Sequence, residues 1–154
     1  MATRDRYYRL ITIVMMLSWW LVLSACQGAA APAATPIPTL AFGTPVILPY
    51  GQYTDISVDD LKGMLAHKDF VLINVTTPPD GVIAGTDLSI PYDQIDQNTS
   101  KLPGDKKALI VVYCRSGRPS GIASAALVKL GYTRVLNLVG GLDAWQKAGY
   151  TIVK

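Results

Sequence analysis

The sequence has few residues of two types that often carry chemistry, cysteine and histidine. Its 154 residues include two cysteines, Cys26 and Cys114, and one histidine, His67. Zinc sites draw most of their ligands from these two residue types, so no metal site is expected. His67 follows the expected end of a helix beside Lys68 and Asp69, which favours a solvated surface group over a catalytic base.

Charged residues are also sparse and nearly balanced. The chain has 14 Lys and Arg against 11 Asp and Glu, and three of the arginines and one aspartate lie in the first nine residues. Without those nine residues the net charge falls to about +1. This balance supplies no basic face for a phosphate backbone, so no nucleic-acid partner is expected.

The N-terminal residues follow the pattern of a secretory leader. Basic residues precede the run Leu10–Leu23, which is apolar apart from Thr12 and Ser18. The run is shorter than the roughly 20 residues that a membrane-spanning helix needs. It ends in the sequence LSAC, closing at Cys26, which resembles the lipobox of bacterial lipoproteins.

That resemblance implies a signal peptide over residues 1–25 and a lipid on Cys26. The domain would then be extracytoplasmic and lipid-anchored to a bacterial cell membrane. An uncleaved N-terminal anchor and ordinary signal cleavage are the alternatives. Residues 26–50 begin with Cys26 and are rich in Ala, Pro and Thr, which predicts an extended tether. The folded domain is predicted over residues 51–154.

Alternating strands and helices are predicted within that domain. Ser57 is an expected N-cap for a helix that ends near Ala66. Further helices are expected over 120–130 and 142–148, and strands over 70–75, 88–91, 109–113 and 134–138. The main strands are apolar without alternation, as in strands buried on both faces. This order predicts an α/β fold with a mostly parallel sheet covered by helices on both faces.

Cys114 closes an apolar strand and opens the segment CRSGRPS, which leads into a helix. Loop N–H groups, the helix N-terminus and neighbouring arginines favour the thiolate form of such a cysteine. If Cys26 is lipidated, Cys114 has no disulfide partner in the chain, which favours a functional thiol.

At this point a family resemblance is clear. Residues 111–153, VVYCRSGRPSGIASAALVKLGYTRVLNLVGGLDAWQKAGYTIV, resemble the C-terminal half of a rhodanese-like domain, and a weaker likeness extends back to Tyr53. The family implies a central parallel sheet of about five strands and a closing apolar strand at the end of this segment. It also implies that Cys114 takes sulfane sulfur from a thiosulfate-like or persulfide donor and passes it, as a persulfide, to a thiol or another nucleophile. The predicted contacts for the anionic donor are Arg115, Ser116, Gly117, Arg118 and Ser120.

The implied partners are a small anionic sulfur donor, an acceptor thiol or protein, and the membrane through the lipid anchor; no cofactor is implied.

Some positions depart from the family pattern. Pro119 stands where active members commonly have arginine, and Asn74 and Thr76 stand where Asp and Arg are frequent. A non-catalytic rhodanese-like module that binds a sulfur species or a protein partner therefore remains the alternative.

Two other enzyme classes fit less well. Cysteine-dependent phosphatases need an arginine six places after the cysteine, where this chain has Ser120. A thiol-redox role lacks a second cysteine within the domain to resolve an intermediate.

Overall fold

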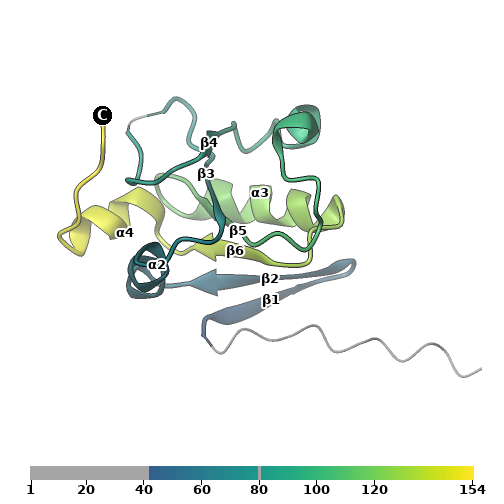
Figure 1. The fold of residues 1–154 in the computed structure, drawn as a ribbon, viewed down its shortest axis with the longest axis horizontal. Coiled ribbons are helices and arrows are strands. Elements are labelled where there is room, and N and C mark those ends of the chain that lie inside the picture. Colours follow the sequence, from purple (N-terminus) through teal and green to yellow (C-terminus); the bar gives the residue numbers. More distant parts are fainter. Residues whose placement is uncertain (1–41, 80) are drawn as a thin grey trace, which may run out of the picture. The chain divides into compact units, whose positions relative to one another are not determined.

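The computed structural model describes residues 42–79 and 81–154. The predicted signal peptide, Cys26 and most of the predicted tether lie outside these residues. The described part forms an α/β fold with a six-stranded sheet in the order β1-β2-β6-β5-β3-β4 (Figure 1). The strands are β1 (Thr44–Leu48), β2 (Gly51–Ile56), β3 (Val71–Asn74), β4 (Leu88–Ser89), β5 (Ile110–Tyr113) and β6 (Val135–Leu138).

The sheet is mostly parallel, as the sequence predicts. Only β1 and β2 pair in the antiparallel sense, and every other neighbouring pair is parallel. The sheet has six strands where the family resemblance led us to expect about five. The sixth is β1, which comes from a segment predicted to be part of the tether.

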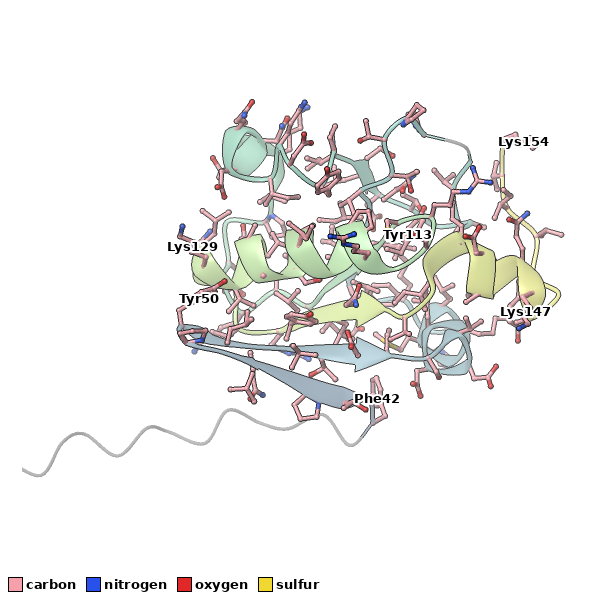
Figure 2. The ribbon with its side chains drawn as sticks, turned by 180° about the vertical axis from the view of Figure 1, so that it is seen from behind. Phe42, Tyr50, Tyr113, Lys129, Lys147 and Lys154 are labelled. Carbon is pink, nitrogen blue, oxygen red and sulfur yellow. The ribbon has the colours of Figure 1, made fainter. Side chains whose placement is uncertain are left out.

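The predicted start of the domain at residue 51 is therefore wrong. Strand β1 pairs with β2 from Thr44 opposite Asp55 to Leu48 opposite Gly51. Prolines in and after β1 are typical of a tether, but β1 is an edge strand, and an edge strand tolerates a proline whose N–H position faces away from the neighbouring strand. Figure 2 shows Phe42 and Tyr50 at opposite ends of this hairpin.

Helices cover both faces of the sheet, as predicted. They are α2 (Val58–Leu65), α3 (Arg118–Lys129) and α4 (Gly141–Lys147), with a 3₁₀ helix, η1 (Asp96–Lys101), after β4. The Ser57 hydroxyl accepts the Asp60 N–H at 3.1 Å, and the Asp60 carboxylate accepts the Ser57 N–H at 2.9 Å. This capping box confirms the predicted start of α2.

Alternate residues of β5 point into two separate apolar layers. Val112 packs in the layer that contains α3, and Val111 packs in the layer that contains α2 and α4. Each residue of β5 is buried, which confirms the prediction of a strand covered on both faces. In residues 42–79 and 81–154, no helix is both long and apolar enough to cross a membrane.

The closing apolar strand expected near the C-terminus does not form. Only Val153 makes a β-bridge there, with Val82, through two N–H to C=O bonds of 2.8 Å. The last residues therefore lie beside the segment after β3 without adding a strand to the sheet.

Candidate active site

Cys114 follows the last residue of β5, at the edge of the sheet where the parallel strands β3, β5 and β6 all end. Its side chain is fully buried. The Cys114 Sγ accepts the Gly117 N–H at 3.0 Å and donates its own hydrogen to the Ser120 Oγ at 3.3 Å. The Ser120 hydroxyl in turn donates to the Gly117 carbonyl at 2.8 Å. The thiol is thus closed into a ring of hydrogen bonds with the loop that follows it.

This ring can hold the sulfur in its anionic form. The Gly117 N–H remains a donor when Cys114 loses its proton. A serine hydroxyl rotates freely, so Ser120 can turn its hydrogen from the Gly117 carbonyl to the sulfur. A sulfur anion would then receive two hydrogen bonds, and hydrogen bonds to charged groups are the stronger kind.

Helix α3 follows this loop directly in the chain and begins at Arg118, two residues earlier than the sequence predicts. Gly117 is its N-cap, with φ of 98°, and Pro119 lies in the first turn. Proline suits this position because its fixed φ is helical, although it contributes no N–H to a bound anion. The positive end of the helix dipole therefore faces the loop. Because of Pro119, this helix end offers an anion one backbone N–H donor fewer than it would with any other residue there.

The turn between β6 and α4 holds the outer side of the loop. The Leu142 N–H donates to the Cys114 carbonyl and the Asp143 N–H to the Arg115 carbonyl, each at 2.9 Å. These are first-turn donors of α4, which have no partner within their own helix. A β-carbon on Gly117 would lie 2.8 Å from the Gly140 nitrogen, so the two segments require glycine to approach this closely.

A pocket of about 350 Å³ opens beside the thiol. Arg115 is its only lining residue with a formal charge among the residues that the structure describes. The Arg115 Nε lies 3.6 Å from a carboxylate oxygen of Asp143, and both side chains are more than half exposed. The lining residues are Thr76, Thr77, Pro78, Pro79, Tyr92, Cys114, Arg115 and Pro119.

The predicted contact residues separate into three groups. Arg115 lines the pocket with Cys114. Gly117 and Ser120 bind the sulfur from the side of α3. Ser116 and Arg118 are exposed and lie outside the set of lining residues. Their roles in binding stay predictions.

The positions that depart from the family pattern have distinct places. Thr76 and Pro119 line the pocket. Asn74 is buried at the end of β3, where its Oδ1 accepts the Thr76 N–H at 3.0 Å and its Nδ2 donates to the Gly81 carbonyl at 3.4 Å. Asn74 therefore shapes the turn that carries Thr76 into the pocket wall.

The sequence places Thr76 at the same strand-end edge as Cys114, but it did not indicate Thr77, Pro78, Pro79 and Tyr92 as further parts of the pocket wall. Residues 76–79 reach it because the Val75 N–H donates to the Tyr113 carbonyl at 2.8 Å, which sets the end of β3 beside Cys114. The turn signal TTPP directly after a buried strand could have indicated this. Nothing in the sequence pattern singles out Tyr92.

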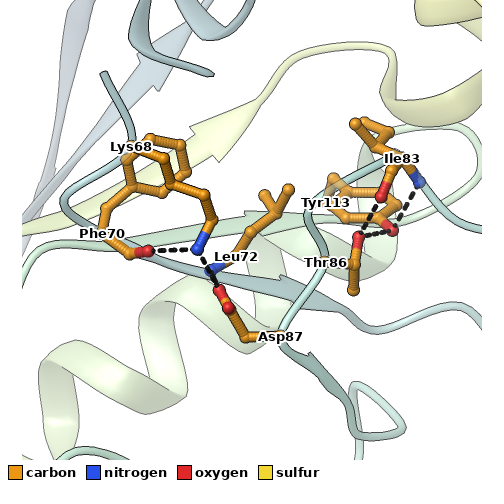
Figure 3. Close-up of polar contacts among 7 residues, drawn as sticks. All are labelled: Lys68, Phe70, Leu72, Ile83, Thr86, Asp87 and Tyr113. Carbon is orange, nitrogen blue, oxygen red and sulfur yellow. Dashed lines mark hydrogen bonds and ion pairs between the residues drawn. The ribbon is translucent and has the colours of Figure 1, made fainter. Parts of the chain in front are cut away.

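Tyr113, the residue before the cysteine, packs in the apolar layer on the other face of the sheet from Cys114. Its polar contacts are shown in Figure 3. Its hydroxyl accepts the Ile83 N–H at 3.0 Å and bonds the Thr86 Oγ1 at 2.7 Å. Burial raises the pKa of Tyr113, and the hydrogen bonds with Thr86 and Ile83 offset only part of that rise. The phenol therefore stays neutral at physiological pH.

The chain is similar to known proteins over this same region. Residues 57–148 match the family model of the rhodanese-like domain. A sulfurtransferase of Allochromatium vinosum is 39% identical over 103 residues, which is 64% of this chain and 94% of that protein. The thiosulfate sulfurtransferase PspE of Escherichia coli is 38% identical over a shorter stretch of 55 residues, 36% of this chain and 52% of that protein.

The fold agrees with the sequence similarity. The crystal structure of a rhodanese-related protein from Thermoplasma volcanium superposes with a TM-score of 0.56 at 25% identity, covering 64% of this chain and 96% of that one. The matched family region contains the cysteine loop, Ser120 and the turn that leads into α4. The chain belongs to the rhodanese-like domain family.

Proposed function

We propose that this protein is a sulfurtransferase that carries sulfane sulfur as a persulfide on the Sγ of Cys114. The donor would be thiosulfate-like or a persulfide, and the acceptor a thiol or another nucleophile. The observation that carries the proposal is the placement of Cys114: a buried sulfur, bonded by the Gly117 N–H, on the wall of a pocket that also contains Arg115. Similarity to proteins named sulfurtransferases supports it.

In the first half-reaction, a sulfur atom is transferred from the donor to Cys114. Cys114 gives up its proton to solvent, and its Sγ attacks the outer sulfur of the donor. A bond forms between the two sulfur atoms while the donor's own S–S bond breaks, and the electron pair leaves with sulfite when the donor is thiosulfate. Arg115 provides the positive charge that draws an anionic donor into the pocket. Ser120 and the Gly117 N–H stabilise the attacking thiolate.

In the second half-reaction, this sulfur atom is transferred from the Cys114 persulfide to the acceptor. A deprotonated acceptor thiol attacks the outer sulfur of the persulfide and forms a new S–S bond. The bond to Cys114 breaks, and its electron pair returns to the Sγ as thiolate. The sulfur moves without net oxidation or reduction of the protein, so the cycle needs no redox cofactor.

A non-catalytic module is the second candidate, because two lining positions lack groups that active members commonly carry. Thr76 and Pro119 line the pocket with neutral side chains, and Pro119 also has no N–H. Such a module would hold a sulfur species or a partner protein without turnover.

Intact mass measurement distinguishes these functions. The purified protein is incubated with thiosulfate, weighed, then treated with an excess of a small thiol and weighed again. Transfer predicts a gain of one sulfur atom that the thiol removes, together with release of one equivalent of sulfite; Cys114→Ser should show no gain. A gain that the thiol cannot remove favours the non-catalytic module. The absence of an adduct with thiosulfate and with a persulfide donor would contradict the enzyme.

We also propose that the domain works outside the cytoplasm, attached to a bacterial membrane by a lipid on Cys26. The support is the order of a basic start, an apolar run and the sequence LSAC. Metabolic labelling with an alkyne fatty acid tests this. The label should appear on the full chain and on Cys114→Ser but disappear in Cys26→Ser. A label that persists in Cys26→Ser, or is absent from the full chain, would contradict lipidation of Cys26.

A further inference from the structure

The composition of the pocket wall bears on which sulfur donors fit it. Four of its eight lining residues have side chains that are mainly hydrocarbon: Pro78, Pro79, Pro119 and Tyr92. They come from the turn after β3, the segment before η1 and the start of α3, so three separate parts of the chain build one apolar surface. Its volume of about 350 Å³ lies within the range of sites that enclose small organic molecules.

The charge of the pocket is weak by comparison. Arg115 is the one charged lining residue in the described part of the chain, and the Asp143 carboxylate lies 3.6 Å from its Nε. The Arg115 side chain is 61% exposed, so water screens its attraction for an anion. Pro119 replaces one N–H donor in the first turn of α3. These features suit one negative charge better than the two of inorganic thiosulfate.

Tyr92 is well placed to contact an organic group. It is half-buried and packs against the apolar layer on the α3 side of the sheet, which holds its ring in place. An aromatic ring that is already fixed offers contact area at little entropic cost. Tyr92 lines the same pocket as Cys114, so its ring is available to contact a donor that binds there.

We infer that the preferred donor is a singly charged organic sulfane-sulfur compound with an apolar substituent, and that Tyr92 helps to select it. This inference rests on the proposed sulfur transfer at Cys114. With an organic thiosulfonate as donor, Cys114 Sγ bonds to the terminal sulfur. The S–S bond of the donor breaks, and the electron pair leaves with the sulfinate.

The test compares two donors that share one reacting group. Benzenethiosulfonate and methanethiosulfonate are both singly charged and differ in the size of the apolar substituent. Rates of sulfur uptake by Cys114 are divided by the rates of the same donors with free N-acetylcysteine, which removes their intrinsic difference in reactivity. We expect kcat/KM for the phenyl donor to exceed that for the methyl donor at least tenfold, or about 1.4 kcal/mol. Both should exceed thiosulfate after the same correction.

Variants of Tyr92 test whether this residue causes the preference for the phenyl donor. Tyr92→Ala should lower the phenyl to methyl ratio severalfold, while Tyr92→Phe, which keeps the ring, should retain it. If Tyr92→Ala fails to fold, the wild-type ratios and Tyr92→Phe still decide the case. A corrected ratio near one, or a preference for thiosulfate, would overturn this inference and leave sulfur transfer intact. No sulfur on Cys114 from any of the three donors would overturn the proposed function and this inference with it.

Discussion

Gly141 lies against the backbone of Cys114 so closely that no side chain fits between them. A β-carbon on Gly141 would stand 2.0 Å from the Cys114 carbonyl oxygen and 2.7 Å from that of Arg115. The same carbonyl of Cys114 accepts the Leu142 N–H at 2.9 Å. The turn before α4 is therefore a support for the cysteine loop as well as a connection between elements.

Gly141→Ala is expected to damage both stability and sulfur uptake. The substitution adds a backbone clash to a φ of 55°, which side chains rarely adopt. The combined strain and overpacking should lower the free energy of unfolding by roughly 3 kcal/mol or more. Chemical denaturation measures the loss of stability, and intact mass after thiosulfate treatment measures sulfur uptake.

Gly131→Ala is the matched control for this prediction. Gly131 also has a positive φ, of 91°, but a β-carbon there meets no atom within 4 Å. It should cost only the conformational strain, about 1–2 kcal/mol, and leave sulfur uptake per folded molecule unchanged. Equal losses of stability in the two variants would contradict the close contact between Gly141 and Cys114.

Ser120→Ala should slow sulfur uptake without unfolding the protein. The Ser120 hydroxyl bonds the Cys114 sulfur at 3.3 Å and the Gly117 carbonyl at 2.8 Å. Losing one hydrogen bond to a charged sulfur, worth about 1.5 kcal/mol, should reduce the rate roughly tenfold. Stopped-flow measurement of sulfite release at fixed thiosulfate gives this rate.

Ser124→Ala provides the control from the same helix, one turn further on. Ser124 is also fully buried, but its hydroxyl has no hydrogen-bond partner among the residues that the structure describes. Removing an unpaired buried hydroxyl is expected to leave stability unchanged or raise it, and to leave the rate of sulfite release unaltered. If both variants lowered that rate equally, the contact between Ser120 and Cys114 would not be the cause.

Gly63→Ala should stabilise the protein. Gly63 lies inside α2 with an ordinary helical φ, and a β-carbon there meets no atom within 4 Å. Alanine restricts the unfolded chain and favours the helix, which should raise the free energy of unfolding by roughly 0.5–1 kcal/mol. The denaturation midpoint measures the gain, and a lower midpoint would show that α2 is not helical at this position.

The sequence predicts the chemistry of this site better than its shape. Cys114, Gly117 and Ser120 are close in the chain, so the pattern of strand, loop and helix brings them together locally. Tyr92 reaches the pocket only through the path of the chain after β4, and the wall at 76–79 depends on the pairing of β3 with β5. Local patterns carry no information about such contacts between distant segments, whereas parallel pairing determines them.

The proline content before residue 51 led to a wrong prediction of where the domain begins. Pro45 and Pro49 resemble the prolines that precede them, and the whole segment was therefore predicted to be a tether. Strand β1 forms because it pairs with β2 across a short turn at Pro49 and Tyr50 and needs a ladder on one side only. An edge strand tolerates proline, so proline content alone does not mark the boundary between tether and domain.

Asp87 should make stability depend on pH in the acid range. Its Oδ2 accepts hydrogen bonds from the Lys68 ammonium at 2.6 Å and the Leu72 N–H at 2.7 Å (Figure 3). Burial acts to raise the pKa of Asp87, but the hydrogen bonds from Lys68 and Leu72 and the charge of Lys68 outweigh it, so the pKa is lowered. The carboxylate thus stabilises the fold above its ordinary pKa, and this contribution is lost as the pH falls through the lowered value.

Asp87→Asn should therefore lower the free energy of unfolding at pH 7 by about 1 kcal/mol, a modest loss because the side chain is 41% exposed and partly screened by water. Urea denaturation at pH 7 and at successively lower pH measures the difference from the wild type. That difference should shrink once the wild-type carboxylate is protonated. Asp93→Asn, at an exposed position, should change stability by less than about 0.5 kcal/mol at either pH. A difference for Asp87→Asn that stays constant into strong acid would mean that shape and not charge at this position stabilises β3.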